Sequence, residues 1–154
     1  MKKRLIALLL AVIMLFSIAP FSGYAETKLS EIRLTSSTSS VQPGSLPAYS
    51  ITSSTAAVQS ISEYSSYGTF WAVWSQNDTA WRGCNAQTPA VAVNDGITHY
   101  AMRVQVNLKS DYAFDEETKI YFNGTDITSL GHTEIDVFSW GGNIYIDLGT
   151  AGTE

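Results

Sequence analysis

Three of the four tryptophans lie close together in the stretch YGTFWAVWSQNDTAWRG, residues 67–83. Flat aromatic rings stack on sugars or cations in binding sites, and they also fill hydrophobic cores. Because side chains alternate along a strand, Trp74 and Trp71 point to opposite sides of the segment GTFWAVWS. We assign Trp74 to the core, which leaves Trp71 facing outward, and Trp81 lies in the loop that follows. The sequence therefore predicts Trp71 and Trp81 as ligand-binding candidates.

A second aromatic set, Phe138, Trp140 and Tyr145, lies on a predicted hairpin near the end of the chain. These rings share the side of the hairpin that is opposite its aliphatic residues. They are further ligand-binding candidates, for a glycan or for another protein. The alternative is that they stabilise the hairpin by cross-strand pairing, or that the N-terminal segment covers them.

The densest run of carboxylates occurs in DYAFDEE, which contains Asp111, Asp115, Glu116 and Glu117. Carboxylate oxygens are the ligands that Ca²⁺ prefers, so these residues are weak candidates for a calcium site. The spacing differs from that of an EF-hand loop, and a solvated loop between strands is the favoured interpretation. We expect no other metal and no other cofactor.

Residues that act in catalysis are sparse. The two histidines, His99 and His132, lie outside an HExxH pattern, and the chain has no GxSxG motif. Cys84 is the single cysteine, so no intramolecular disulfide can form, and a catalytic thiol there would need a neighbouring histidine. The sequence therefore predicts a protein that is not an enzyme and has no catalytic residues.

The first 25 residues have the pattern of a secretory signal peptide. A basic start precedes an apolar run over residues 5–18, and the small residues Gly23 and Ala25 precede the expected cleavage point. An uncleaved anchor is disfavoured, because this run is shorter than the roughly 20 residues of a membrane span. We expect a secreted, extracellular chain of residues 26–154, associated with the cell surface or free, and without membrane contact after cleavage.

The charge and length of the mature chain limit its class. Cleavage removes Lys2, Lys3 and Arg4, which changes the formal net charge from −5 to −8. Such an acidic chain is a poor match for nucleic acid, and we expect no nucleic-acid partner. The remaining length suits a single domain with a hydrophobic core. The sequence does not indicate the oligomeric state.

Two regions differ in how clearly they predict strands. Residues 35–66 are rich in Ser and Thr and lack helical spacing. These residues form either strands or a flexible linker in front of the domain, and residues 26–48 are the part that could be partly linker. The two-residue alternation at 32–34 and 49–51 favours strands. From Tyr100 to Leu108 the alternation is unbroken, which predicts a strand with one buried face.

The last hairpin, EIDVFSW followed by GG and NIYIDL, is predicted to turn at Gly141-Gly142, so that Trp140 pairs with Asn143. The same register sets Asp136 opposite Asp147. Two like charges facing each other are unfavourable and indicate either a fraying end of the hairpin or a bound cation.

Many short strands, frequent turn signals such as Asp95-Gly96 and Asn123-Gly124, and the lack of a long helix predict an all-β protein. The predicted architecture is an antiparallel β-sandwich of about seven or eight strands, with a small β-barrel as the alternative. The predicted strands are residues 30–35, 48–53, 69–75, 89–93, 99–109, 118–122, 134–140 and 143–149.

The order of several landmarks resembles immunoglobulin-like and fibronectin-like β-sandwich modules of secreted and cell-surface proteins of Gram-positive bacteria. The residues that carry this resemblance are the bend VQPGSLP, Trp74, Tyr100, Tyr112, Phe114 and Asn123-Gly124. The resemblance covers residues 41–128 and implies an immunoglobulin-like sandwich in which these residues are core or turn positions. The chain departs from the pattern at QNDTAWRGCNAQT and at the aromatic final hairpin.

Taken together, these features favour an exported, non-catalytic binding or adhesion module. Its ligand is expected to be a cell-surface glycan or protein, held by aromatic stacking and by polar groups of loops. A structural spacer or assembly domain without a small ligand is the first alternative, and a small secreted hydrolase is the second.

Overall fold

The computed structural model describes residues 26–62, 71–84 and 91–152 of the chain. This part of the protein is all-β, with several sheets, one of them curled into half a barrel, and it confirms the predicted all-β class. Over the same residues there is no helix long and apolar enough to cross a membrane. The strands are β1 (Thr27–Thr35), β2 (Gly44–Ser45), β3 (Thr52–Ser53), β4 (Val58–Ser62), β5 (Trp71–Trp74), β6 (Arg82–Gly83), β7 (Val91–Ala92), β8 (His99–Leu108), β9 (Tyr112–Phe122), β10 (Thr125–Asp126), β11 (Glu134–Phe138) and β12 (Gly141–Thr150).

The first sheet has the strand order β10-β9-β1-β3. β1 runs parallel to β9, although the two strands are far apart in the sequence, and β3 and β10 are antiparallel to their neighbours. The pairing of β1 with β9 is interrupted: Leu29 pairs with Phe114, but Glu31 already pairs with Lys119. The extra residues of β9 form a bulge there, which contains most of the acidic run.

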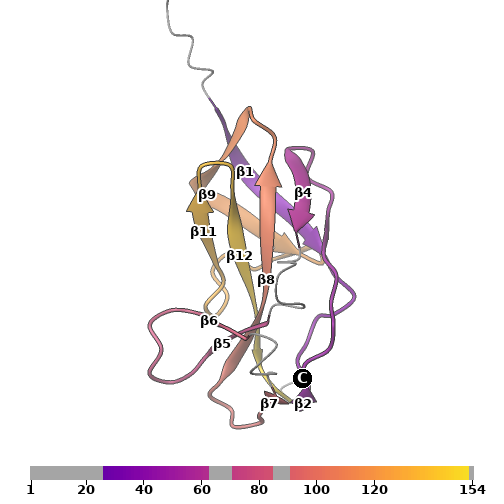
Figure 1. Cartoon of the computed structure of the whole chain (residues 1–154), viewed down its shortest axis with the longest axis vertical. Helices are drawn as coiled ribbons and strands as arrows, with labels where there is room; N and C mark the ends of the chain where they lie inside the picture. Colours follow the sequence, from indigo (N-terminus) through magenta and orange to yellow (C-terminus); the bar gives the residue numbers. More distant parts are fainter. Residues whose placement is uncertain (1–25, 63–70, 85–90, 153–154) are drawn as a thin grey trace, which may run out of the picture.

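The second sheet has the order β11-β12-β8-β5-β6, and β4 also pairs with β8. β5 pairs with the first half of β8 and β4 with the second half, so these two short strands share one edge of the long strand. The short strands β2 and β7 form a separate pair. Figure 1 shows this pair at the opposite end of the molecule from the start of β1.

The core joins residues of the first two sheets in one cluster. In β8 the alternating side chains from Tyr100 to Leu108 are buried, as predicted. Ile32 of β1, Ile120 of β9 and Ile144 of β12 belong to the same cluster and have almost no exposed surface. Branched side chains on one face of each strand therefore build the core, which is the arrangement that period-two alternation predicts.

The Ser/Thr-rich segment packs onto this core. It contains the short strands β2, β3 and β4, and Val41, Tyr49 and Ile51 are buried. The prediction of strands here is confirmed in part, since only the end of the predicted strand 48–53 is β-structure and β4 lies outside the predicted set. Val58 and Ile61 are only partly buried, so β4 gives a weak alternation signal.

Several predicted strand boundaries differ from the structure. β9 begins at Tyr112 rather than at residue 118, because residues 112–114 pair with β1 and the acidic residues that follow form a bulge inside the strand. β6 and β10 have two residues each and lie outside the predicted set. The predicted signal peptide (residues 1–25) and the first two residues of each of the predicted strands 69–75 and 89–93 lie outside the described residues.

The predicted register of the final hairpin is wrong. Phe138 pairs with Gly141 and Asp136 with Asn143, so the turn is at Ser139-Trp140. The two glycines are in β12, and a Cβ on Gly141 would overlap the carbonyl oxygen of Val106 in β8. Contact with β8 therefore requires glycine there, and this tertiary demand overrides the local turn signal.

The shift leaves the two faces of the hairpin unchanged. It moves the turn by two residues, and two is the period of a strand. Ile135 still lies on the same side as Ile144, and Phe138 on the same side as Tyr145, as predicted. The turn at Asn123-Gly124 is confirmed, since both residues have positive φ between the paired strands β9 and β10.

Candidate ligand-binding face

Trp71 does not face outward, and this prediction is wrong. The residue is 2% exposed and lies in the main core. Its indole Nε1–H donates to the carbonyl oxygen of Pro47 (2.8 Å), and its ring packs edge-on against Tyr49 with centroids 5.2 Å apart. The orientation follows from pairing with β8, because Trp71 lies opposite the buried Met102. A ring enclosed in this way has no face left for a ligand.

Trp74 lies instead on the face of the second sheet that points away from the core, which we call the outer face. It is half-buried, and its assignment to the central core is therefore wrong. Each side of the segment GTFWAVWS carries a tryptophan, so this segment alone does not decide which side is buried. The side is decided by β8, where Trp74 lies opposite His99.

Trp81 packs beside Trp74 on the outer face and is only 8% exposed. The two rings meet edge to face with centroids 5.6 Å apart. The Trp81 Nε1–H donates to the carbonyl oxygen of His132 (2.8 Å), and the ring lies parallel to that of Tyr145 at 6.0 Å. Of the two tryptophans predicted as ligand contacts, Trp81 is thus the one on the outer face.

Both histidines join this aromatic group, which sequence reasoning missed. The His132 ring stacks on Trp74 at 4.0 Å, and the His99 ring meets His132 edge to face at 5.1 Å. Asp147, whose side chain is 2% exposed, holds them together. Its Oδ2 lies 2.8 Å from His99 Nδ1 and accepts the backbone N–H of His132 at 2.8 Å.

The predicted pairing of Asp136 with Asp147 does not occur, and the cation inferred from it loses its basis. Asp136 lies opposite Asn143 and Asp147 opposite Ala101.

The His99–Asp147 pair has the geometry that orients a general base. Within the described residues, however, Asp147 is the only side chain that hydrogen-bonds to His99, and no serine or cysteine is paired with it. Asp147 therefore sets the orientation of the His99 ring.

A cavity of about 340 Å³ opens beside this group on the outer face. Trp81 and Tyr145 supply its rings, and Glu134 and Asp136 supply two carboxylates. The Arg103 guanidinium lies 5.6 Å from the centre of the Tyr145 ring. Burial raises the pKa of Tyr145 above its usual value, and the carboxylates of Asp136 and Glu134 add to this rise while Arg103 opposes it. The site combines apolar rings with a few polar groups, as small-ligand sites do.

Polar side chains continue the outer face across the sheet. Asn143 Nδ2 donates to Asp136 Oδ2 (3.4 Å), and Gln105 of β8 lies opposite Asn143. Farther along β8, Asn107 Nδ2 donates to Ser60 Oγ of β4 at 2.9 Å. The face therefore presents amides and hydroxyls next to the aromatic cavity.

The remaining predicted aromatics lie at the tip of the hairpin. The Phe138 and Trp140 rings contact each other with centroids 4.3 Å apart. Phe138 is partly buried, whereas Trp140 is 56% exposed. Tyr145, Phe138 and Trp140 thus lie on one hairpin, with Glu134 opposite Tyr145 and Asp136 between the two aromatic positions.

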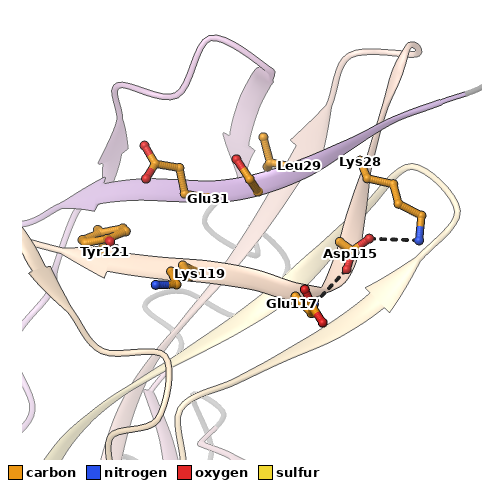
Figure 2. Close-up of a pocket in the computed structure, with 8 residues that line it drawn as sticks. Lys28, Leu29, Glu31, Asp115, Glu117, Lys119 and Tyr121 are labelled. Carbon is orange, nitrogen blue, oxygen red and sulfur yellow. Dashed lines mark hydrogen bonds and ion pairs between the residues drawn. The ribbon is translucent and has the colours of Figure 1, made fainter.

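Most of the acidic run lies in β9 of the other sheet, where Asp115 and Glu116 share a second cavity, of about 370 Å³, with Glu134 and Ile135 of β11. Figure 2 shows an open groove of about 520 Å³ over the bulge between β1 and β9, lined by Lys28, Asp115, Glu117 and Lys119 among others. Asp115 Oδ2 pairs with Lys28 Nζ at 2.9 Å, and Asp115 Oδ1 accepts the Glu117 backbone N–H. This backbone hydrogen bond first, and Lys28 second, hold the pKa of Asp115 below its usual value.

The calcium candidates are not gathered around one point. Asp111 lies in the turn before β9, and Asp115 uses both carboxylate oxygens within the protein. Glu116 and Glu117 are exposed on the bulge. Among residues 26–62, 71–84 and 91–152, no three His, Cys, Asp or Glu side chains are placed to share a metal ion.

Cys84 packs against the main core and is partly buried. Its backbone N–H donates to the carbonyl oxygen of Trp71 at 2.7 Å. Burial raises the pKa of the thiol, and the nearby Arg82 opposes this rise only in part. A raised thiol pKa is the opposite of what a nucleophilic cysteine needs.

Comparison with known proteins gives no match: no family model, no curated protein and no solved structure is significantly similar to this chain.

Proposed function

We propose that the protein is an exported, non-catalytic binding module that holds an oligosaccharide along its outer face. The observation that carries the proposal is the cavity in which the rings of Trp81 and Tyr145 lie beside the carboxylates of Glu134 and Asp136. Aromatic rings offer apolar surface to the faces of sugar rings, and carboxylates accept hydrogen bonds from hydroxyl groups. We further propose that the two main sheets form an immunoglobulin-like β-sandwich that supports this face.

The length of the face suits a chain of sugars better than a single sugar. Glu134, which pairs with Tyr145, and Phe138 are four residues apart on β11. At about 3.3 Å per residue, this places the cavity and the aromatic hairpin tip about 13 Å apart. The exposed Trp140 ring extends the tip farther, so an oligosaccharide reaches both aromatic positions at once.

The experiment is a glycan array screened with the chain of residues 26–154, followed by calorimetry on the glycans that bind. Tyr145→Ala and Trp140→Ala test the two aromatic positions, and each is expected to weaken binding at least about tenfold, as the loss of a central contact does. Leu130→Ala is the control, because Leu130 is also an exposed apolar residue (53%) but lies outside the cavity lining and the hairpin tip. Unchanged affinity in both aromatic variants contradicts the proposal.

A structural spacer or assembly domain is the second candidate, and one observation favours it. Trp71 and Trp81 are both buried, and each uses its Nε1–H in a hydrogen bond within the protein. This is how aromatic residues behave when their role is packing. If the protein is such a spacer, no glycan on the array binds, and the only effect of Tyr145→Ala is a lower melting temperature.

A further inference from the structure

The charged groups that line the outer-face cavity are all carboxylates. Glu134 and Asp136 lie on the same side of β11, and their Cα atoms are about 7 Å apart. No basic side chain is among the described residues that line this cavity. The cavity thus accepts hydrogen bonds and attracts positive charge.

The two carboxylates affect each other. Burial raises the pKa of Glu134, Asp136 raises it further, and only His132 acts against them. The unfavourable interaction of two negative groups is relieved when a cation binds between them. The Arg103 guanidinium lies over the Tyr145 ring, and Arg103 is not among the described residues that line the cavity.

Asn143 of β12 lies opposite Asp136 of β11 on the outer face. The amide group donates its Nδ2–H to Asp136 Oδ2, and Asn143 is 8% exposed. This orientation leaves Asn143 Oδ1 buried without a hydrogen-bond partner among the described residues. An unsatisfied buried acceptor is unfavourable. The amide orientation that donates to Asp136 therefore leaves Asn143 Oδ1 without a hydrogen bond.

We propose that this cavity binds an unacetylated amino sugar within the oligosaccharide, with the ammonium group between Glu134 and Asp136. This inference rests on the proposed glycan-binding function. The sugar ring lies against Tyr145 and the rim of Trp81, where the positive charge also meets the aromatic faces. The −8 charge of the mature chain attracts a glycan that carries several such groups.

The same geometry disfavours two other ligands. An N-acetylated sugar is neutral at this position, so it leaves both carboxylates without a positive partner. A calcium ion needs six to eight oxygen ligands, whereas the described residues offer no set of three ligating side chains.

The test compares glucosamine oligomers, N-acetylglucosamine oligomers and glucose oligomers of equal length by calorimetry on residues 26–154. The glucosamine oligomer is expected to bind at least about tenfold more tightly than the acetylated one. Glu134→Gln and Asp136→Asn each remove one negative charge and are expected to weaken the binding of the glucosamine oligomer at least about tenfold more than that of the glucose oligomer, so that the preference for glucosamine is lost. Both residues are exposed, and thermal melting shows whether each variant is folded.

Asp111→Asn is the matched control, since it removes the same charge from an exposed residue that lies in the turn between β8 and β9 and outside the cavity lining. If Asp111→Asn weakens binding of the glucosamine oligomer as much as Asp136→Asn does, the oligomer responds to the overall negative charge of the protein, and the proposed ammonium site between Glu134 and Asp136 is wrong. A lysine-rich peptide that binds as tightly as the glucosamine oligomer also overturns the inference, because it shows that the sugar is not recognised.

The two proposals fail in different ways. If acetylated and free oligomers bind equally and the variants change neither, the amino-sugar inference is wrong while the glycan function stands. If none of the three oligomers binds and the array is empty, the glycan function itself is wrong, and this inference falls with it.

Discussion

Trp71 carries the clearest prediction for a single residue. Trp71→Ala is expected to lower the free energy of unfolding by about 3–5 kcal/mol, because the change empties part of the core and leaves the carbonyl of Pro47 without its donor. Denaturant unfolding of both proteins measures this loss. Trp140→Ala makes the same chemical change at a residue that is 56% exposed, and we expect it to change stability by about 0.5 kcal/mol or less. An equal loss of unfolding free energy in the two variants contradicts the assignment of Trp71 to the core.

Cys84 gives a prediction about reactivity. Because burial raises the pKa of its thiol, little thiolate is present at neutral pH. We expect a thiol reagent to modify folded protein several-fold more slowly than protein unfolded in denaturant. Equal rates in the two states indicate that the thiol is as accessible and as acidic as a free one.

Glu134 gives a prediction about pH. Its raised pKa means that the folded protein favours the protonated form, so the stability from this group is full below its ordinary pKa and is lost as pH rises through the folded pKa. Glu134→Gln mimics the protonated form and is expected to raise the melting temperature at pH 7. The charged and titratable groups near Glu134 are Asp136, His132 and Tyr145 on the outer face, with Arg103 beyond the Tyr145 ring, and Asp115 and Glu116 of β9 in the second cavity that Glu134 lines.

The gain from Glu134→Gln is expected to be below about 1 kcal/mol, because the residue is exposed and solvent screens its charge. The gain disappears near pH 4, where the natural side chain is itself protonated. A gain that is the same at both pH values shows that charge is not its cause. Residues whose charge reduces stability are frequent in binding sites.

For single residues, the sequence predicted which aromatic residues lie together on the final hairpin better than it predicted which way the tryptophans of β5 point. Tyr145, Phe138 and Trp140 lie on one hairpin as expected. The exchange of Trp71 and Trp74 was unpredictable, since either side of their strand was apolar enough for a core. The contact of His99 with His132 depends on the approach of distant segments, and no local pattern encodes it.

Among the elements, the β11–β12 hairpin shows how tertiary contacts override a local signal. Gly141-Gly142 is a common turn sequence, yet both glycines lie in β12, where β8 and Phe114 leave no space for a side chain. The register therefore depends on β8, which lies outside the hairpin. In contrast, the faces of the hairpin were predictable, since alternation survives a shift of two residues.

Gly141→Ala tests this explanation. The added methyl group meets the carbonyl oxygen of Val106, so we expect a loss of about 1–3 kcal/mol in the free energy of unfolding. Ser139→Ala is the control in the exposed turn and is expected to change stability by about 0.5 kcal/mol or less. A larger loss for Ser139→Ala than for Gly141→Ala points back to a turn centred on the two glycines.

Strands with a strong alternation of apolar and polar residues were predictable from the sequence, and strands with a weak alternation were not. β8 was predicted almost to the residue, because each of its apolar positions is buried. β4 and β9 were missed or cut short, because Ser, Thr and acidic residues occupy them and their pairing partners lie far away in the sequence. Sequence patterns therefore reveal burial, but they do not reveal pairing.

For the whole molecule, the sequence predicts cleavage of a signal peptide after Ala25. Such cleavage would leave Glu26 as the single residue in front of β1, which begins at Thr27. We expect protein recovered from the medium of an expressing bacterium to begin at Glu26, as measured by intact mass. A mass that still includes residues 1–25 contradicts the prediction of a cleaved signal peptide.

The parallel pairing of β1 with β9 also fixes the order in which the molecule is completed. Synthesis releases β1 first, but its long partner strand begins only at Tyr112. Pairings this distant in sequence form slowly, because a long loop must close before any contact compensates for it. Until then both long edges of β1 are open to other chains, and mismatched association competes with folding. The first strand made is thus among the last to be secured, and chain concentration during folding decides how much protein reaches the native state.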